Sequence, residues 1–179
     1  KDLFQLTKFE IVVLEIITLV AGYFIGHSME MALDWAHFAK VVFGVTFLAM
    51  AAGAINQVQE REEDSQMDRT RNRPLPSGRI SVAFAKTLSM VLILLGIVLL
   101  SQVSGLVVAL GLAAVLSYNV LYTLWWKRKL AFAAIPGAIP GALPILIGYQ
   151  AALPPGAGVS LSSYSSTLPL LDPRGIYLF

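Results

Sequence analysis

The feature that most restricts what this chain can fold into is a series of five apolar stretches, each close to the length of a membrane-spanning helix. A bilayer core of about 30 Å requires roughly 20 helical residues to cross it. The five stretches are residues 8–26, 38–55, 82–101, 104–126 and 130–152. Because lipid offers no partner for an unpaired backbone N–H, each stretch should be helical. The sequence therefore predicts an all-α, polytopic transmembrane helical bundle.

The composition excludes several other classes of protein. Hydrophobic residues make up 56% of the chain and charged residues only 13%, whereas soluble domains average about 45–50% and about 25%. The absence of cysteine excludes a disulfide scaffold, a zinc–cysteine site, an iron–sulfur cluster and a thiol nucleophile. Basic residues alternate with acidic ones and form no continuous stripe, so no nucleic-acid partner is expected.

The C-terminal part of the chain predicts an outer loop over residues 153–174 and the first turn of a sixth apolar helix over 175–179. The chain opens on Lys1 and has no signal-peptide pattern at its start. We therefore expect residues 1–179 to form a single transmembrane domain that is an N-terminal piece of a longer protein.

The positions of Lys and Arg predict the orientation of the bundle. Eleven of the thirteen fall before the first stretch, between the second and third or just inside the third, or between the fourth and fifth. Only Lys40 and Arg174 fall on the other side. Since positive loops stay in the cytoplasm, the N-terminus, the 56–81 loop and the 127–129 turn are predicted to be cytoplasmic.

The loop after the second stretch carries the residues best suited to chemistry. Asn56, Glu60 and Asp64 recur every four residues. If the helix continues beyond the membrane surface, they drift only about 80° over eight residues and share one face. An amide and two carboxylates offer the hard oxygen ligands that Mg²⁺ prefers, with phosphate oxygens of a substrate completing its shell. The spacing therefore predicts a magnesium–phosphate site.

Arginines follow this repeat directly. Arg69, Arg71 and Arg73 supply guanidinium groups suited to phosphate oxygens, and Pro74 and Pro76 end the helix and stiffen the return to the third stretch. The alternative interpretation is a solvated loop whose alternating charges only keep it soluble and oriented. Acids at four-residue spacing, followed by arginines and a proline pair, favour the phosphate site.

These residues resemble a known motif. The pattern Asn56-x-x-x-Glu60-x-x-x-Asp64, followed by Met67-Asp-Arg-Thr-Arg-Asn-Arg-Pro-Leu75, resembles the first aspartate-rich motif of the UbiA-type intramembrane prenyltransferases. The residue pattern is most similar to that of the protoheme IX farnesyltransferase (haem O synthase) branch. Weaker matches are Leu6-Thr7-Lys8 before the first stretch and Tyr122-Thr-Leu-Trp-Trp-Lys127 at the end of the fourth.

The resemblance implies a bundle of nine transmembrane helices in a bacterial inner membrane, around a cavity open to the cytoplasmic leaflet. It implies an Mg²⁺-dependent enzyme that transfers farnesyl from farnesyl diphosphate to a vinyl group of haem B, giving haem O and diphosphate. Asn56, Glu60 and Asp64 would be the catalytic metal-binding residues. The residues that would hold the diphosphate are Arg69, Arg73, Tyr122 and Lys127.

The chain departs from the family pattern at several points. Glu60 stands where an aspartate is usual, and Tyr122 and Lys127 are five residues apart where four is common in the family. The second aspartate-rich motif and the later histidines of this branch would lie beyond residue 179. By itself, we expect this piece to be inactive, because half of the metal site would be missing.

Other polar and small residues in the apolar stretches carry weaker expectations. Glu15 would be costly against lipid and should face the bundle interior or water. Tyr118 and Tyr122 are candidates to stabilise a carbocation, whereas Trp125 favours an interfacial aromatic belt. Gly141, four residues after Gly137, predicts close helix packing of the fifth stretch.

Two other functions remain open. The first is a prenyltransferase of the same fold that acts on an aromatic quinone or chlorophyll precursor. The second is a non-catalytic membrane protein such as a transporter subunit, which predicts no Mg²⁺-dependent binding of a diphosphate.

Overall fold

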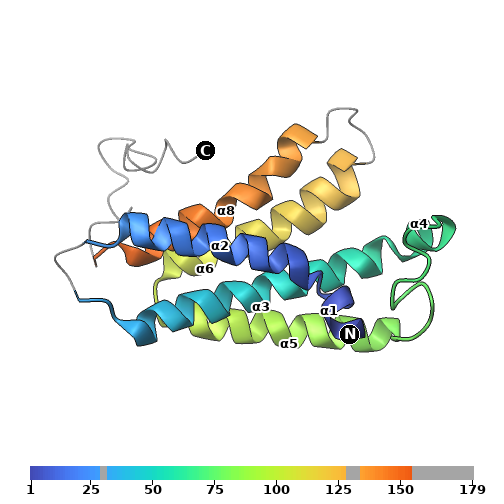
Figure 1. The fold of residues 1–179 in the computed structure, drawn as a ribbon, viewed down its shortest axis with the longest axis horizontal. Helices are drawn as coiled ribbons and strands as arrows, with labels where there is room; N and C mark the ends of the chain where they lie inside the picture. The colour runs from blue at the N-terminus through green and yellow to red at the C-terminus, as the bar shows by residue number, and fades with distance from the viewer. Residues whose placement is uncertain (29–31, 128–133, 155–179) are drawn as a thin grey trace.

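The computed structural model describes residues 1–28, 32–127 and 134–154, and every regular element in these ranges is helical (Figure 1). The elements are α1 (Asp2–Leu6), α2 (Phe9–Gly26), α3 (Trp35–Gln59), α4 (Arg61–Gln66), α5 (Val82–Ser101), α6 (Gly105–Leu116), the π-helix η1 (Ser117–Trp126) and α8 (Ala134–Ala152). The all-α prediction is confirmed. The expected turn of a sixth helix lies outside the described residues.

Four of the five predicted spans appear as helical segments long and apolar enough to cross a membrane. They are α2, α3, α5 and the continuous segment Gly105–Trp125 formed by α6 and η1. The fifth predicted stretch is the 19-residue helix α8, which contains Pro140 and Pro144. A short turn joins α5 to α6, and the Ser104 side chain caps α6 by accepting from the backbone N–H groups of Leu106 and Val107. This turn makes α5 and α6 a hairpin of two consecutive helices (Figure 1).

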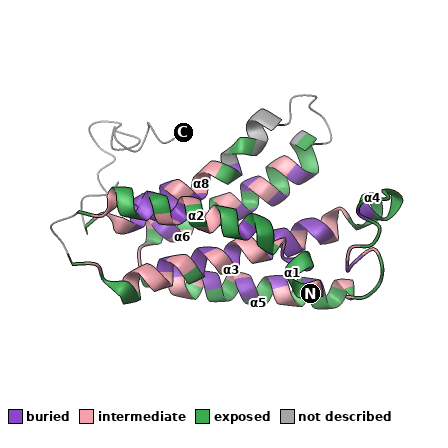
Figure 2. Cartoon of the chain, in the orientation of Figure 1, coloured by how far each residue is buried: buried purple, intermediate pink, exposed green. Residues whose placement is uncertain are grey.

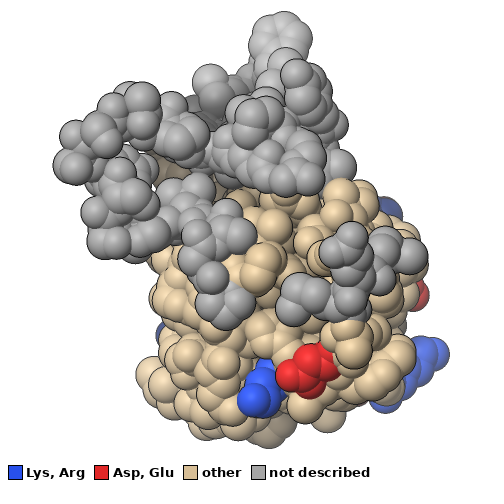
Figure 3. Space-filling model, turned by 90° about the vertical axis from the view of Figure 1, so that its left-hand side faces the viewer, with Lys and Arg blue, Asp and Glu red and all other residues tan. Residues whose placement is uncertain are grey.

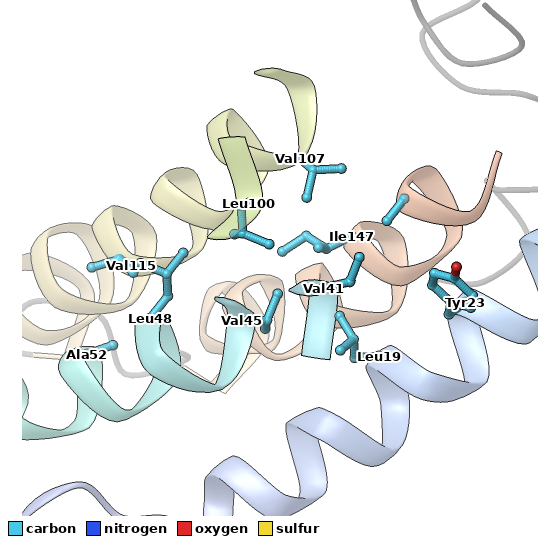
Figure 4. Packing of buried hydrophobic residues seen from close by; sticks show 11 residues of the cluster. Leu19, Tyr23, Val41, Val45, Leu48, Ala52, Leu100, Val107, Val115 and Ile147 are labelled. Carbon is cyan, nitrogen blue, oxygen red and sulfur yellow. The ribbon is translucent and has the colours of Figure 1, made fainter. Parts of the chain in front are cut away.

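The bundle core lies where α3 meets the other long helices. Leu19 of α2, Leu48 of α3, Leu100 of α5, Val107 of α6 and Ile147 of α8 belong to one buried apolar cluster (Figure 4). Exposed residues nevertheless line the outer sides of the helices (Figure 2). Many are large and apolar, among them Leu14, Phe24, Phe43, Leu94, Val98 and Leu116. Apolar side chains on both faces of a helix are expected where lipid is the solvent.

Helices α2 and α8 cross closely through glycines that the sequence analysis did not single out. A Cβ atom on Gly22 would lie 2.0 Å from the carbonyl oxygen of Ile145, and one on Gly148 would lie 2.0 Å from that of Leu19. A Cβ on Gly141 would meet nothing within 4 Å. The prediction that Gly141 packs closely against another helix is therefore wrong, and for Gly137 the structure describes the helix but not the contacts around it.

The polar connections gather at one end of the bundle. Helix α1, helix α4 and the 67–81 loop all lie at the same end (Figure 1). The opposite end carries few charged side chains on the described part of its surface (Figure 3). At the end that carries α1, α4 and the 67–81 loop, Arg79 links α1 to the loop. Its guanidinium pairs with Asp2 at 3.1 Å and donates to the carbonyl of Asn72.

The second predicted span does not continue as one helix through Asp64. Helix α3 ends at Gln59, and Glu60 (φ −99°, ψ 9°) separates it from α4. Backbone hydrogen bonds between residues four apart nevertheless persist across the bend. The Glu60 N–H donates to the Asn56 carbonyl, and the Asp64 N–H donates to the Glu60 carbonyl. The continuous helix is thus corrected to two helices with a bend at Glu60.

Candidate functional site

A cavity of about 500 Å³ lies at the charged end of the bundle. All seven site residues expected from the sequence line it, namely Asn56, Glu60, Asp64, Arg69, Arg73, Tyr122 and Lys127. Five further residues complete the described wall, namely Lys8, Glu63, Met67, Tyr118 and Thr123. Segments more than 100 residues apart in the sequence thus contribute to one polar hollow.

Asn56 is buried at the end of α3, and its amide is held at both ends. Its Nδ2 donates to Thr123 Oγ1 at 3.0 Å, and its Oδ1 accepts from the Lys8 ammonium. Thr123 Oγ1 in turn donates to the carbonyl of Tyr118 at 2.8 Å. Because a buried amide settles in the orientation that satisfies both of its ends, Thr123 keeps the Asn56 oxygen directed at a cation.

The π-helix explains why Tyr122 and Lys127 can act together despite their five-residue spacing. A π-helix forms i→i+5 hydrogen bonds, which bring residues five apart onto neighbouring turns. The Lys127 backbone N–H donates to the Tyr122 carbonyl, and both side chains line the cavity. The Lys127 ammonium reaches across to Glu60 Oε1 at 2.5 Å. The unusual spacing is therefore matched by an unusual helix.

The loop after α4 fixes Asp64 against Arg73. Arg73 Nη1 lies 2.7 Å from Asp64 Oδ2, and the Asp64 side chain is only 7% exposed. Thr70 Oγ1 donates to the backbone carbonyl of Asp64 at 2.9 Å, which anchors the loop between the pair. The buried Leu75 packs in a second apolar cluster with Leu6 and so pins the loop to the bundle. The loop is therefore held against the helical bundle by both polar and apolar contacts.

Lys8 is the most informative residue that the sequence analysis left out of the site. Its backbone adopts the left-handed region (φ 53°), which costs a non-glycine residue about 1–3 kcal/mol and is concentrated at functional sites. This conformation turns the chain between α1 and α2. Burial lowers the pKa of the Lys8 ammonium below its ordinary value, with nearby Glu60 opposing the shift. The signal available in the sequence was the family-like Leu6-Thr7-Lys8 opening.

The three expected metal ligands are each engaged by a different cation. Lys8 contacts Asn56, Lys127 contacts Glu60, and Arg73 contacts Asp64. The described ranges contain no group of three carboxylate or imidazole ligands that could hold a metal without help. Two carboxylates and an amide nevertheless form the hard-oxygen set that suits Mg²⁺ bound together with phosphate oxygens. The residues present therefore fit a magnesium–diphosphate ligand better than a free ion.

A second cavity, of about 220 Å³, adjoins the first. Lys8 and Tyr118 line both. The Lys8 ammonium donates to Tyr118 Oη at 3.2 Å and lies 5.8 Å from the centre of its ring. The remainder of this cavity is mostly apolar and runs between the spans, with walls that include Leu48, Val115, Pro144 and Ile147. The polar and the apolar cavity thus lie next to each other, with the Lys8–Tyr118 pair lining both.

Comparison with known proteins shows the family of this chain. The family model described as the UbiA prenyltransferase family matches residues 16–171. The chain belongs to the UbiA prenyltransferase family. Among the relatives of this UbiA-family chain, the protoheme IX farnesyltransferase of Bdellovibrio bacteriovorus is 47% identical over 150 residues, which is 84% of this chain and 51% of that protein. The protein of the same name in Rhodopirellula baltica is 41% identical over 150 residues, covering 83% and 51%.

Solved structures share the fold of this UbiA-family chain. A structure from work on digeranylgeranylglyceryl phosphate synthase in membranes superposes with a TM-score of 0.76 at 25% identity, covering 86% of this chain and 53% of that one. A UbiA homologue from Archaeoglobus fulgidus bound to DMAPP and Mg²⁺ gives a TM-score of 0.75 at 17% identity, covering 90% and 57%. The chain spans about half the length of the curated relatives it matches.

Proposed function

We propose that the protein containing this chain transfers a farnesyl group from farnesyl diphosphate to a vinyl group of haem B, with addition of one water, giving haem O and diphosphate. The observation that carries the proposal is one cavity that gathers an amide, three carboxylates and several cations. Relatives named protoheme IX farnesyltransferase, at 47% and 41% identity, support the choice of reaction.

The residues of the polar cavity suit the departure of a diphosphate. Asn56, Glu60 and Asp64 would hold Mg²⁺, which when bound neutralises charge on the leaving group. Arg69, Arg73 and Lys127 place positive charge where negative charge grows as the carbon–oxygen bond breaks. Tyr122 lies beside them on the same wall.

The apolar cavity suits the prenyl chain. A diphosphate among the cations would put its carbon chain at the Lys8–Tyr118 junction, with the apolar walls beyond. These walls exclude water and so delay capture of the allylic cation. The ring of Tyr118 offers a π face to that cation, and Tyr122 stacks with it at 6.0 Å between ring centres.

The proposal includes location and orientation. The protein would lie in the bacterial cytoplasmic membrane, with the N-terminus and the 56–81 loop in the cytoplasm. The charged diphosphate group of the substrate would then enter the site from the cytoplasmic side. The excess of Lys and Arg on that side supports this orientation.

The direct test uses the complete protein made by the organism, reconstituted in vesicles. Farnesyl diphosphate should bind only when Mg²⁺ is present, and chelation should weaken binding at least tenfold. Haem B should be converted to a farnesylated product, whereas 4-hydroxybenzoate should not be prenylated. Prenylation of the benzoate alone would transfer the assignment to aromatic acceptors, and absence of Mg²⁺-dependent diphosphate binding would favour a non-catalytic membrane protein.

A further inference from the structure

Glu15 is an acidic residue in the middle of a membrane span that the proposed chemistry has not yet used. It lies in α2 and faces the apolar cavity, together with Lys8, Val45 and Ile147. Of the described residues around that cavity, Glu15 supplies the one carboxyl group. Ionisable residues within membrane spans are costly and mark functional positions.

The position of Glu15 relative to the polar cavity is set by helix geometry. Lys8 precedes the first residue of α2, and Glu15 lies seven residues further along, about 10 Å of helical rise. Both side chains line the same cavity, which is otherwise mostly apolar. Across the described ranges, the ion pairs involve other residues and none includes Glu15.

Prenyl transfer to carbon releases one proton. The C1–oxygen bond of the prenyl diphosphate breaks, and both electrons leave with the diphosphate. The cation at C1 then takes a π electron pair from the acceptor, which forms the new carbon–carbon bond and leaves a cation on the adjacent acceptor carbon. With a vinyl acceptor, water bonds to that carbon and loses a proton; with an aromatic ring, the substituted carbon loses its own proton. No oxidant or reductant is needed in either case.

We infer that Glu15 is the base that accepts this proton. The other described polar groups around the apolar cavity suit the role less well. Lys8 is a hydrogen-bond donor to both Asn56 and Tyr118, and Tyr118 receives that bond. Thr7 uses its hydroxyl to donate to the carbonyl of Leu3. A carboxylate acts by contrast as an acceptor alone, and positioned carboxylates are common general bases.

This inference rests on the proposed prenyl transfer but not on which carbon acceptor is used. The experiment compares Glu15→Gln and Glu15→Asp in the complete, reconstituted protein. The matched control is Glu10→Gln, because Glu10 lies on the same helix with an exposed side chain and lines neither cavity. Single-turnover measurements follow three quantities: farnesyl diphosphate affinity, diphosphate released, and prenylated acceptor formed with haem B or, if haem B is inert, with 4-hydroxybenzoate.

Glu15→Gln should keep the affinity for farnesyl diphosphate within about twofold and still release diphosphate. It should form prenylated acceptor at least 20-fold more slowly, so that the ratio of diphosphate to product rises as the cation is lost to water. Glu15→Asp should recover part of the rate, and Glu10→Gln should match the unmodified protein.

Two results would overturn the role of Glu15. Product formation by Glu15→Gln at the unmodified rate would show that another group, such as the released diphosphate, takes the proton. Parallel loss of binding, diphosphate release and product would show a structural role. An unmodified protein that prenylates neither acceptor would instead reject the proposed function itself.

Discussion

The pairing of Asp64 with Arg73 allows a stringent prediction, because the same loop contains a matched exposed pair. Asp64→Asn keeps the size of the side chain and one oxygen acceptor but removes the charge that Arg73 faces at 2.7 Å. Asp68→Asn makes the same change in a pair with Arg71, 3.3 Å long, in which the acidic side chain is 93% exposed.

The expected magnitudes follow from burial. A hydrogen bond to a charged group contributes about 1.5–3 kcal/mol and a neutral one about 0.5–1.5, so Asp64→Asn should lower the free energy of unfolding by about 1–2 kcal/mol. At Asp68 an exposed pair contributes at most about 1 kcal/mol, and the change should be near zero. Loss of a metal-binding carboxylate should also reduce turnover at least 100-fold, about 2.7 kcal/mol at 1.36 kcal/mol per tenfold.

The assay measures thermal unfolding in detergent micelles, calorimetric binding of farnesyl diphosphate with Mg²⁺, and prenylation of haem B, all on the complete protein. Asp68→Asn should retain activity within twofold. If Asp64→Asn and Asp68→Asn have indistinguishable turnover, the assignment of Asp64 to the metal–diphosphate site is refuted. A loss of turnover that merely tracks loss of folded protein would refute it equally.

Three further predictions concern the ends of the site and the bundle. Glu60→Asp, which installs the residue usual in the family, should keep turnover within about tenfold, whereas Glu60→Gln should lose at least 100-fold; equal losses would show that carboxylate charge is not what matters there. Thr123→Val removes the oxygen that accepts from Asn56 Nδ2, so farnesyl diphosphate affinity should fall about 5- to 20-fold, and Thr123→Ser should restore it in a titration. Gly148→Ala would place a Cβ 2.0 Å from a backbone oxygen of α2 and should destabilise the bundle by about 2 kcal/mol or more. Gly105→Ala, where a Cβ meets nothing within 4 Å, is the control in the same melting experiment, and equal melting temperatures would contradict the close crossing.

Hydrophobic length was sufficient for the spans, and polar spacing was sufficient to single out Asn56, Glu60 and Asp64 with the arginines that follow them. Spans are long, nearly uninterrupted apolar runs whose only structure compatible with lipid is helical, so their limits fall within a few residues of those observed. Asn56, Glu60 and Asp64 could be identified because their four-residue spacing along one short segment reflects helical geometry. The assignment of Arg69, Tyr122 and Lys127 depended in addition on a family resemblance, and their shared cavity is consistent with it.

Errors arose where partners come from distant segments. The sequence indicated small residues at Gly141, but which glycine meets another backbone depends on where two helices cross, and that point is at Gly22 and Gly148. Nor did the spacing of Asn56, Glu60 and Asp64 reveal the bend at Glu60.

The sequence by itself determined that this chain is a membrane-embedded helical bundle with an oxygen-rich, phosphate-suited segment at one end, because local periodicity and the cost of polar groups in lipid act within single helices. Only the tertiary structure decided which groups meet. It brought Lys8 to Asn56 across 48 positions, gave the π-helix that aligns Tyr122 with Lys127, and placed Glu15 in a cavity that shares Lys8 and Tyr118 with the polar site. Those contacts depend on how helices pack against one another, and no single segment contains that information.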